Sequence, residues 1–408
     1  MIWEKHNIIN VILFIDNYPI PSGGMEMHAH AFMQHFKNHS RIRIQHVIAF
    51  SNSPHDVQNN KDGILVLPKS IIHNPNGLIT ALRKVGISDH GVFFFNSLYW
   101  IETLAVLKKT FPDTVYIQRS GGNDIMQSRV PAGGNTLAER QKFVVSTLNA
   151  HLDTLIINSE YTRSRFKILG ICDALMYTIV GGVDTKIFHP ITKDQQRILR
   201  LNMQLPLDKT IILSVCRMVS FKGLPYLICA IAKLAARNIH YIIVGDGPEK
   251  QRIQTLIDQN GLQDSVTLVG EIPMQDIHKY YKASDIYALT PIEELVIIKE
   301  ESYIRTETMG RSFCEAIATN LPIVASLVGG IPEVLKKYPH AVLVSQQNTV
   351  ATTHAIMTKL EPCYQYIKSN ITLPNTHSWY AIFNTYEQLF TTTSAHRHTC
   401  RTRPSNET

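Results

Sequence analysis

The feature that most constrains the fold is a repeated alternation of short apolar runs with amphipathic stretches. In the first half, the apolar runs recur at 8–15, 45–50, 64–67, 92–95, 114–118, 154–157 and 176–180. Helical patterns lie between several of them, as at 100–111, 137–150 and 159–169. Strands that alternate with helices in this way pair in parallel and are covered on both faces. The pattern therefore predicts an α/β fold with a doubly wound sheet.

A second series with the same rhythm begins at 210–215 and continues through 241–245, 266–270, 285–289 and 322–325. Because 408 residues exceed one comfortable core, we expect two domains, 1–190 and 191–378. The polar stretch 192–197 is interpreted as the linker region. A last amphipathic helix is expected over 379–390, followed by a disordered tail over 391–408.

The composition is that of a soluble globular protein. Hydrophobic residues make up 44% of the chain and charged residues 18%, and no apolar run approaches the length of a membrane span. The six cysteines form no C-x-x-C pair, and the eighteen histidines show no H-E-x-x-H spacing. We therefore expect reduced core thiols in a cytoplasmic protein, and no metal.

The formal charge of +7 favours anionic partners such as nucleotides, phosphates or acidic lipid surfaces. Basic runs with interleaved aromatic residues are absent from the sequence, so nucleic acid is not expected as a partner. Arg397, Arg401 and Arg403 give the tail a basic character. A solvated tail is the favoured interpretation, and peripheral contact with the inner face of a membrane is the alternative.

Residues 307–315 combine two carboxylates, Glu307 and Glu315, with Gly310 and the start of a helical pattern. The first turn of a helix has backbone N–H groups without internal partners and carries the positive end of the helix dipole. We therefore predict an anion site at Arg311 and Ser312, with carboxylates that bind hydroxyls on either side of a phosphate. An ordinary capped helix is the alternative.

Two cations follow the first strand of the second half. Arg217 comes shortly after the run 210–215, and Lys222 precedes Gly223 and a helical pattern. Because an arginine fork and a lysine point charge can converge on one diphosphate, we predict a diphosphate site here. Two solvated surface cations are the alternative.

Two glycine-bearing loops follow strands of the first half. Gly23 and Gly24 would let the backbone approach a phosphate, because no Cβ intervenes. The loop 119–124 combines a cation, two glycines and Asp124, which is our candidate catalytic residue on the acceptor side. Ligands of doubly wound sheets bind beyond the carboxyl ends of the strands, where both loops lie. Plain turns are the alternative.

Taken in order, these motifs resemble the retaining, nucleotide-sugar-dependent glycosyltransferases of family four, which have the GT-B fold. The resemblance runs through most of the chain and implies two Rossmann-like domains that face each other across a cleft. The N-terminal domain would bind the acceptor, the C-terminal domain would bind the donor, and the last helix would return to the N-terminal domain. The motifs are Gly23-Gly24-Met25-Glu26, Asn158-Ser159, Gly182-Val183-Asp184, Arg217 with Lys222-Gly223, Gly245-Asp246-Gly247-Pro248, 307–315, 329–333 and Ser378-Trp379.

The resemblance also implies roles for individual residues. Arg217 and Lys222 would bind the diphosphate of the donor with help from the backbone of 310–312. Glu315 would bind the ribose hydroxyls, and Glu307 would face the donor sugar. The loop with Gly23 and Gly24 would approach the phosphates from the other domain.

The implied reaction is the retaining transfer of a hexosyl group from a UDP- or GDP-linked sugar to a hydroxyl acceptor, without a cofactor or metal. The acceptor would be a glycan, a lipid-linked glycan or a small molecule. Departure of the nucleoside diphosphate builds negative charge, which nearby cations and a helix N-terminus stabilise. In the family's front-side substitution, the departing phosphate takes the proton of the acceptor.

The chain departs from the family in two places. The loop 119–124 lacks a histidine that many members carry, which leaves open whether a catalytic base exists there. The stretch 292–306 is longer than the family norm. It is interpreted as a surface insertion, with a lid or a partner-binding flap as the alternative.

Two other functions fit the same fold, namely a nucleotide-sugar epimerase and a non-catalytic scaffold subunit. The intact cations and carboxylates favour transfer over both. A dehydrogenase is disfavoured because the G-x-G-x-x-G fingerprint is missing. The sequence does not define the donor base and sugar, the acceptor, the linkage or the oligomeric state.

Overall fold

The computed structural model describes residues 8–18, 24–53, 64–130, 133–361 and 377–401, with only the backbone described over 396–401. Contacts between residues divide the chain into two compact units. The first is formed by Met1–Val180, Ile297–Ser302 and Trp379–Thr408, and the second by Gly181–Val296 and Tyr303–Ser378. The division after Val180 comes earlier in the chain than the boundary that the sequence suggested.

Among its described residues, the first unit contains a seven-stranded sheet in the order β3-β2-β1-β4-β5-β6-β7, in which all neighbours are parallel. The apolar runs predicted as strands all lie in this sheet, and most of their residues are buried, as expected of parallel strands covered by helices. At the edge of the sheet, Tyr177 is 40% exposed. The strands are β1 (Ile9–Asn17), β2 (Ile42–Ser51), β3 (Ile64–Pro68), β4 (Val92–Phe95), β5 (Val115–Arg119), β6 (Thr154–Ile157) and β7 (Met176–Thr178).

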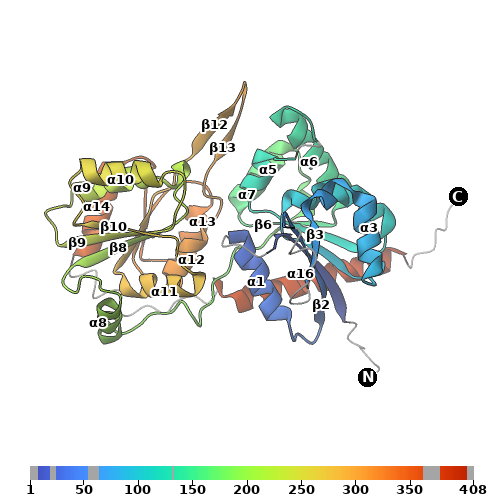
Figure 1. Ribbon diagram of the computed structural model, residues 1–408, viewed down its shortest axis with the longest axis horizontal. Coiled ribbons are helices and arrows are strands. Elements are labelled where there is room, and N and C mark those ends of the chain that lie inside the picture. The colour runs from blue at the N-terminus through green and yellow to red at the C-terminus, as the bar shows by residue number, and fades with distance from the viewer. Residues whose placement is uncertain (1–7, 19–23, 54–63, 131–132, 362–376, 402–408) are drawn as a thin grey trace. The chain divides into compact units, whose positions relative to one another are not determined.

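The helices of the first unit cover both faces of its sheet (Figure 1). They are α1 (Gly24–Phe36), α3 (Pro75–Lys84), α4 (Leu104–Thr110), α5 (Asn123–Gln127), α6 (Leu137–His151), α7 (Glu160–Leu169) and α16 (Trp379–Arg401). Aromatic rings join α1 to α16, with the ring of Phe383 5.7 Å from those of His28 and Phe32. The expected change to a disordered tail at residue 391 is wrong, because α16 continues to Arg401.

The second unit contains, among its described residues, a six-stranded parallel sheet in the order β10-β9-β8-β11-β14-β15. Its strands are β8 (Thr210–Val215), β9 (Ile239–Val244), β10 (Val266–Gly270), β11 (Ile286–Leu289), β14 (Ile323–Ser326) and β15 (Ala341–Val344). The strand order reverses at β8, so the loops after β8 and β11 leave neighbouring strands in opposite directions. Ligands of doubly wound sheets bind at such a switch point.

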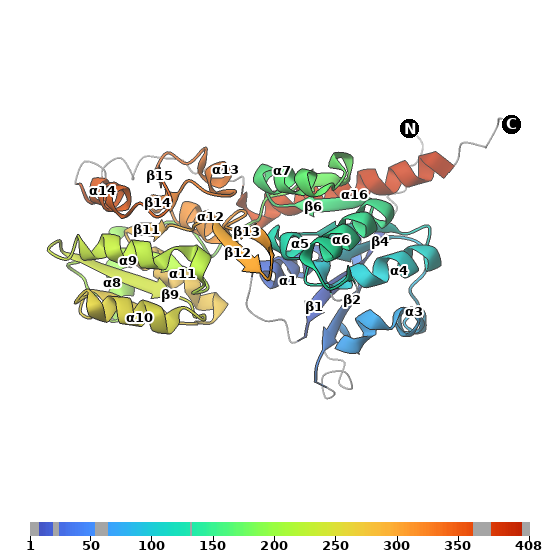
Figure 2. The same cartoon turned by 90° about the horizontal axis from the view of Figure 1, so that it is seen from above.

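Helices α9, α10 and α14 cover one face of this sheet, and α8 and α11 cover the other (Figure 1 and Figure 2). The helices of the second unit are α8 (Lys193–Asn202), α9 (Leu224–Ala232), α10 (Lys250–Gln259), α11 (Met274–Ala283), α12 (Arg311–Ala318), α13 (Ile331–Leu335) and α14 (Thr349–Leu360). The stretch predicted as a linker is therefore mostly the beginning of α8. Thr192 caps this helix by accepting a hydrogen bond from the backbone N–H of Gln195 over 3.2 Å.

The insertion 292–306 folds as a β-hairpin. Its strands, β12 (Glu294–Ile298) and β13 (Glu301–Arg305), pair with each other and with no further strand in the described part of the chain. The hairpin begins shortly after β11 and ends just before Glu307. The insertion therefore lies in the chain between β11, at the switch point of the second sheet, and Glu307.

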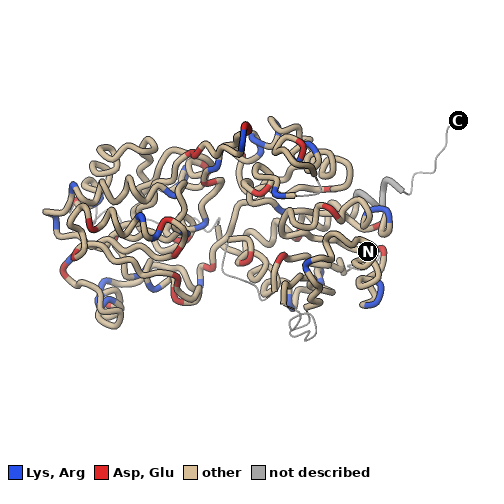
Figure 3. Tube along the Cα trace, turned by 45° about the horizontal axis from the view of Figure 1, so that its top comes forward, with Lys and Arg blue, Asp and Glu red and all other residues tan. Residues whose placement is uncertain are grey.

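Charged residues of both signs are distributed along the trace of each unit. Figure 3 shows Lys and Arg interspersed with Asp and Glu, so the formal charge of +7 is not gathered in a single segment of the described chain. Across the same residues, no helix combines the length and the hydropathy that a membrane-spanning segment requires.

Candidate functional site

The candidate site of the second unit is built on the loops that follow β8 and β11. The first loop contains Arg217 and Lys222, and the second ends with Glu307 and the start of α12. Because β8 and β11 are neighbours in the sheet, their carboxyl ends bring these distant segments of sequence to one edge. This is the edge at which open parallel sheets bind ligands.

Lys222 and Glu307 form an ion pair in which the Lys222 ammonium donates a hydrogen bond to Glu307 Oε2. The two side chains are only 16% and 14% exposed, so the pair is largely shielded from water. Burial alone would lower the pKa of Lys222, but the charge of Glu307, the nearby Cys216 and the hydrogen bond to Glu307 together more than offset it, and the net pKa is raised. Lys222 therefore stays cationic at neutral pH.

The loop before α9 is held against the loop after β11 by close backbone packing. Gly223 has a φ of +69°, and a Cβ at this position would lie 1.8 Å from the carbonyl oxygen of Thr290. The neighbouring Phe221 carbonyl accepts a hydrogen bond of 2.8 Å from the backbone N–H of Ile292. Only glycine combines this conformation with this approach, so the loop that carries Lys222 has one defined position.

A second glycine turn fixes the backbone of Glu307. Gly329 has a φ of +56°, and a Cβ there would lie 1.9 Å from the Glu307 carbonyl oxygen. The same oxygen accepts a hydrogen bond of 3.0 Å from the N–H of Gly330. The glycine pair in the 329–333 motif thus positions Glu307 through its main chain.

The N-terminus of α12 faces the end of β8 across Tyr287. The Tyr287 hydroxyl lies 3.4 Å from the carbonyl oxygen of Val215 and also hydrogen-bonds the side chain of Ser312. Gly310 precedes the helix with a φ of +85° and makes no side-chain cap. The predicted residues 310–312 therefore lie at the same strand ends as Lys222.

Glu315 is the fifth of the eight residues of α12 and is 8% exposed. Its carboxylate is 3.2 Å from Arg311 Nε and accepts a hydrogen bond of 2.8 Å from the Tyr281 hydroxyl. Burial raises the pKa of Glu315, and the Arg311 charge and the Tyr281 hydrogen bond offset only part of the effect. Both carboxylate oxygens thus have protein partners in this structure.

Arg217 lies beyond the end of β8 and is exposed. Its backbone carbonyl accepts a hydrogen bond of 2.9 Å from the N–H of Val219. In the part of the chain that the structure describes, its guanidinium forms no ion pair. Of the two predicted cations, the structure brings only Lys222 into contact with Glu307.

The predicted residues of the first unit lie at the carboxyl ends of its strands. Gly24 begins α1, and Gly23 lies outside the described residues. Asp124 is in the first turn of the short helix α5, where Asp124 Oδ1 accepts a hydrogen bond of 2.6 Å from the Ser120 hydroxyl. Burial raises the pKa of Asp124, although hydrogen bonds from Ser120, Ile125 and Gly121 act against this rise.

Comparison with known protein families decides the class of the second unit. The family model described as Glycosyl transferases group 1 matches residues 196–363, which include both loops of the candidate site. The chain carries a group 1 glycosyltransferase domain. The family resemblance read from the sequence is confirmed.

Relatives of the chain include a GDP-mannose-dependent alpha-(1-6)-phosphatidylinositol monomannoside mannosyltransferase of Mycolicibacterium smegmatis. It is 22% identical over 352 residues, which cover 85% of this chain and 88% of the relative. The GPI3 subunit of the phosphatidylinositol N-acetylglucosaminyltransferase of Saccharomyces cerevisiae is 32% identical over 130 residues, or 31% of this chain and 26% of that subunit. A mannosyltransferase of Mycobacterium tuberculosis with the same name as the first relative is 27% identical over 207 residues, which cover 50% of this chain and 51% of that relative.

Solved structures with the same fold cover nearly the whole chain. Anabaena HepE in complex with UDP and glucose superimposes with a TM-score of 0.71 at 17% identity, over 94% of this chain and 99% of that one. A glycosyltransferase from Rickettsia africae gives a TM-score of 0.71 at 18% identity, with 95% and 99% covered. The predicted fold class, GT-B with two Rossmann-like α/β domains, is confirmed.

A further carboxyl group of the first unit, Asp16, was not selected from the sequence. It lies in β1 and accepts a hydrogen bond from the hydroxyl of Ser97, which follows β4. The pKa of Asp16 is raised to about 7, mainly by burial and also by the charges of Glu26 and Asp124, while the Ser97 hydrogen bond acts against the rise. Asp16 lies at the switch point between β1 and β4. The sequence contained a signal for it, because a carboxyl group directly follows the first apolar run.

Replacement of Asp16 by asparagine is expected to stabilise the first unit at alkaline pH. Because the folded-state pKa is above the ordinary aspartate value of 3.8, ionisation costs stability as the pH rises from about 4 to about 7. The penalty is complete above that window and amounts to about 2–4 kcal/mol. Thermal unfolding at pH 8 should therefore occur at a higher temperature in Asp16→Asn, with the difference vanishing near pH 4. Exposed Asp258→Asn is the control, and an equal gain at both pH values would contradict the expectation.

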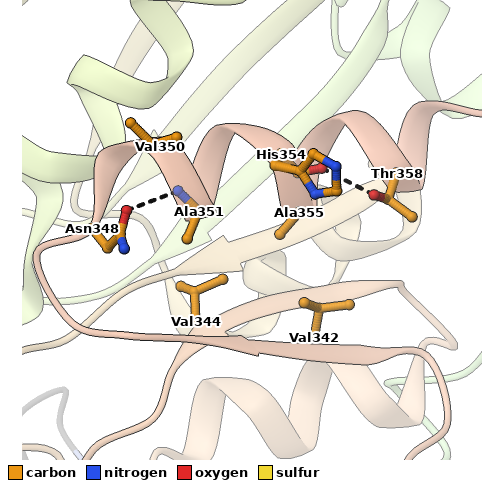
Figure 4. A pocket seen from close by; sticks show the side chains of 8 residues that line it. All are labelled: Val342, Val344, Asn348, Val350, Ala351, His354, Ala355 and Thr358. Carbon is orange, nitrogen blue, oxygen red and sulfur yellow. Dashed lines mark hydrogen bonds between the residues drawn. The ribbon is translucent and has the colours of Figure 1, made fainter.

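The described residues of the second unit line two hollows. One, of about 620 Å³, runs between α14 and β15, where Val342 and Val344 lie opposite His354 and Thr358 (Figure 4). The other, of about 310 Å³, is lined by residues of α12, by residues between 183 and 190, and by His377 and Ser378. Cys314 lies in its wall. Within the described residues, there is no cluster of three or more His, Cys, Asp or Glu side chains that could hold a metal ion.

Proposed function

We propose that this protein is a retaining glycosyltransferase that moves a hexosyl group from a UDP- or GDP-linked sugar to a hydroxyl acceptor. The reaction needs no metal ion in this proposal. The observation that carries the proposal is the Lys222–Glu307 ion pair at the switch point of the second sheet, beside the N-terminus of α12. The donor diphosphate would accept hydrogen bonds from Lys222 and from the first backbone N–H groups of α12.

Each charged group then has a defined task. Lys222 remains cationic and stabilises the negative charge that develops on the leaving diphosphate. Arg217, whose side chain is exposed, would turn to the diphosphate as a second cation. When the phosphates take Lys222, Glu307 is released to face the donor sugar and stabilise the positive charge that develops there. The departing phosphate accepts the proton of the acceptor hydroxyl.

Glu315 would bind the ribose hydroxyls only by exchanging a present partner. Its carboxylate accepts from Tyr281 and pairs with Arg311, so a ribose would have to compete with one of these contacts. Arg311 is the partner on the same helix and is 24% exposed. We propose that the ribose displaces the Arg311 contact, while the Tyr281 hydrogen bond keeps the carboxylate in place.

The activities by which the relatives are named narrow the substrate classes to be tested. The mycobacterial relatives are GDP-mannose-dependent enzymes that act on a phosphatidylinositol mannoside, and HepE is described with UDP. We propose a GDP- or UDP-linked hexose as donor and a lipid-linked glycan as the first acceptor class to test. Such an acceptor would bring the protein to a membrane surface, and Asp124 would orient its hydroxyl.

Replacement of Lys222 by alanine is expected to weaken binding of GDP and UDP by about tenfold to a hundredfold, because a charge-assisted hydrogen bond contributes about 1.5–3 kcal/mol. Calorimetric titration of each nucleotide measures the change. Lys279→Ala is the matched control, since Lys279 pairs with Asp276 over 2.6 Å on the surface of α11. Equal affinities for wild type and Lys222→Ala would remove Lys222 from the site.

A separate experiment distinguishes transfer from epimerisation. If the protein is a transferase, release of the nucleotide from a nucleotide sugar should require an acceptor, whereas an epimerase needs no acceptor.

A further inference from the structure

The hairpin β12–β13 is fixed at its base by one arginine. Arg305 Nε and Nη2 lie 2.8 Å and 2.5 Å from Glu294 Oε2, at the point where the first residue of β12 and the last residue of β13 meet. Both side chains are 24% exposed. A two-stranded sheet alone is marginally stable in water, so the hairpin depends on contacts of this kind.

The same guanidinium also contacts the turn that carries Lys222. Arg305 Nη2 donates a hydrogen bond of 2.9 Å to the Ser220 hydroxyl. The guanidinium carbon lies 5.2 Å from the centre of the Phe221 ring, within the range of a cation–π contact. The Lys222 ammonium lies 5.3 Å from the centre of the same ring. The Phe221 ring therefore packs against both Arg305 and Lys222.

These contacts form a continuous series from the inserted hairpin to Glu307. Glu294 holds Arg305, Arg305 holds the turn at Ser220 and Phe221, and this turn presents Lys222 to Glu307. All of these residues belong to the second unit. The planar fork of arginine makes the three contacts at once, which a single ammonium group does not do.

We propose that Arg305 is a positioning residue for the donor site. It holds the 220–222 turn in the conformation that places the Lys222 ammonium beside Glu307, and so sets the affinity for the donor diphosphate. The inserted hairpin is then a structural part of the donor site. The inference rests on the proposed function, because it acts through the binding of a diphosphate by Lys222.

The test is a double-mutant cycle on the full-length protein, with GDP and UDP as probes in calorimetric titrations. Arg305→Ala is expected to raise the dissociation constant of the nucleotide about tenfold, which corresponds to about 1.4 kcal/mol. In a Lys222→Ala background, the same change is expected to have almost no further effect, because residues in one network are coupled. With donor and acceptor, the KM for the donor should rise while kcat changes less.

Arg305→Lys separates positioning from simple closure of the hairpin. A lysine can pair with Glu294, but it cannot also contact Ser220 and cover Phe221, so its nucleotide affinity should stay close to that of Arg305→Ala. Arg252→Ala is the control, because Arg252 lies on α10, is 63% exposed and pairs with Glu249, the residue before this helix. Thermal unfolding of each variant shows whether it is folded.

The possible results have distinct meanings. Unchanged affinity in Lys222→Ala would overturn the proposed function and, with it, this inference. Weakened binding in Lys222→Ala would leave the proposed function standing. In that case, wild-type affinity in Arg305→Ala, additive effects of the two changes, or full rescue by Arg305→Lys would overturn the role of Arg305.

Discussion

Glu307→Gln is expected to lower kcat by about a hundredfold to a thousandfold, while the affinity for GDP or UDP stays equal or rises. Loss of one preorganised group that stabilises transition-state charge typically has an effect of this size. The nucleotide affinity should not fall, because glutamine removes the negative charge that now pairs with Lys222. Steady-state kinetics and calorimetry on the same preparation measure both quantities.

The matched control for this change is Glu249→Gln. Glu249 precedes α10 and pairs with an exposed arginine, Arg252, over 2.9 Å. It carries the same charge and side chain without a place at the switch point. If Glu307→Gln kept wild-type turnover, or lost nucleotide binding and turnover in equal measure, Glu307 would have no specific role in the transfer step.

Gly223→Ala is expected to destabilise the second unit by about 3 kcal/mol and to weaken nucleotide binding by at least about tenfold. Alanine in the left-handed region costs about 1–2 kcal/mol, and overpacking adds about 1–3 kcal/mol. The added Cβ would lie 1.8 Å from the Thr290 carbonyl oxygen, so the backbone itself must move. That movement would shift Lys222, the preceding residue.

Gly261→Ala separates the two causes of this effect. Gly261 has a φ of +64°, close to the +69° of Gly223, but a Cβ there would have no neighbour within 4 Å. It should therefore show only the conformational penalty and unchanged nucleotide binding. Chemical unfolding and calorimetry of the two variants measure the difference. Similar losses in both would mean that the contact between Gly223 and Thr290 does not position the loop.

The strands and the fold class could be predicted from the sequence because buried parallel strands are continuous apolar runs. The runs at 210–215 and 285–289 correspond to β8 and β11 almost residue for residue. The structure makes these strands neighbours and so brings Lys222 and Glu307 to one edge of the sheet, which the sequence implied only through the family resemblance. Their direct ion pair depends on the Gly223 and Gly329 packing, which no local pattern reveals.

Other features were missed for identifiable physical reasons. The start of α8 was interpreted as a linker because it is polar, although Thr192 and Gln195 form a capping box that the sequence contains. The end of α16 was missed because threonines are poor helix formers. In this helix Thr391 and Thr393 donate hydrogen bonds of 2.8 Å to carbonyl oxygens one turn earlier.

The side-chain partners within the site could not be predicted from local sequence either. Tyr281 and Tyr287 lie in α11 and β11, where their positions are typical of core residues. Only the tertiary structure brings the Tyr281 hydroxyl to Glu315 and the Tyr287 hydroxyl to the end of β8. Arg305 contacts Ser220 and Phe221 for the same reason, because the hairpin base folds back on the turn after β8.

The central claim is that the loops after β8 and β11 bind a nucleoside diphosphate. Hydrogen–deuterium exchange of the full-length protein, with and without saturating GDP or UDP, tests it most directly. Backbone amides that gain a ligand and lose solvent access exchange more slowly. We predict protection concentrated at 217–223 and 307–315 with at least one of the two nucleotides. Saturation of the protein with protection elsewhere, or with none in these two segments, would contradict the claim.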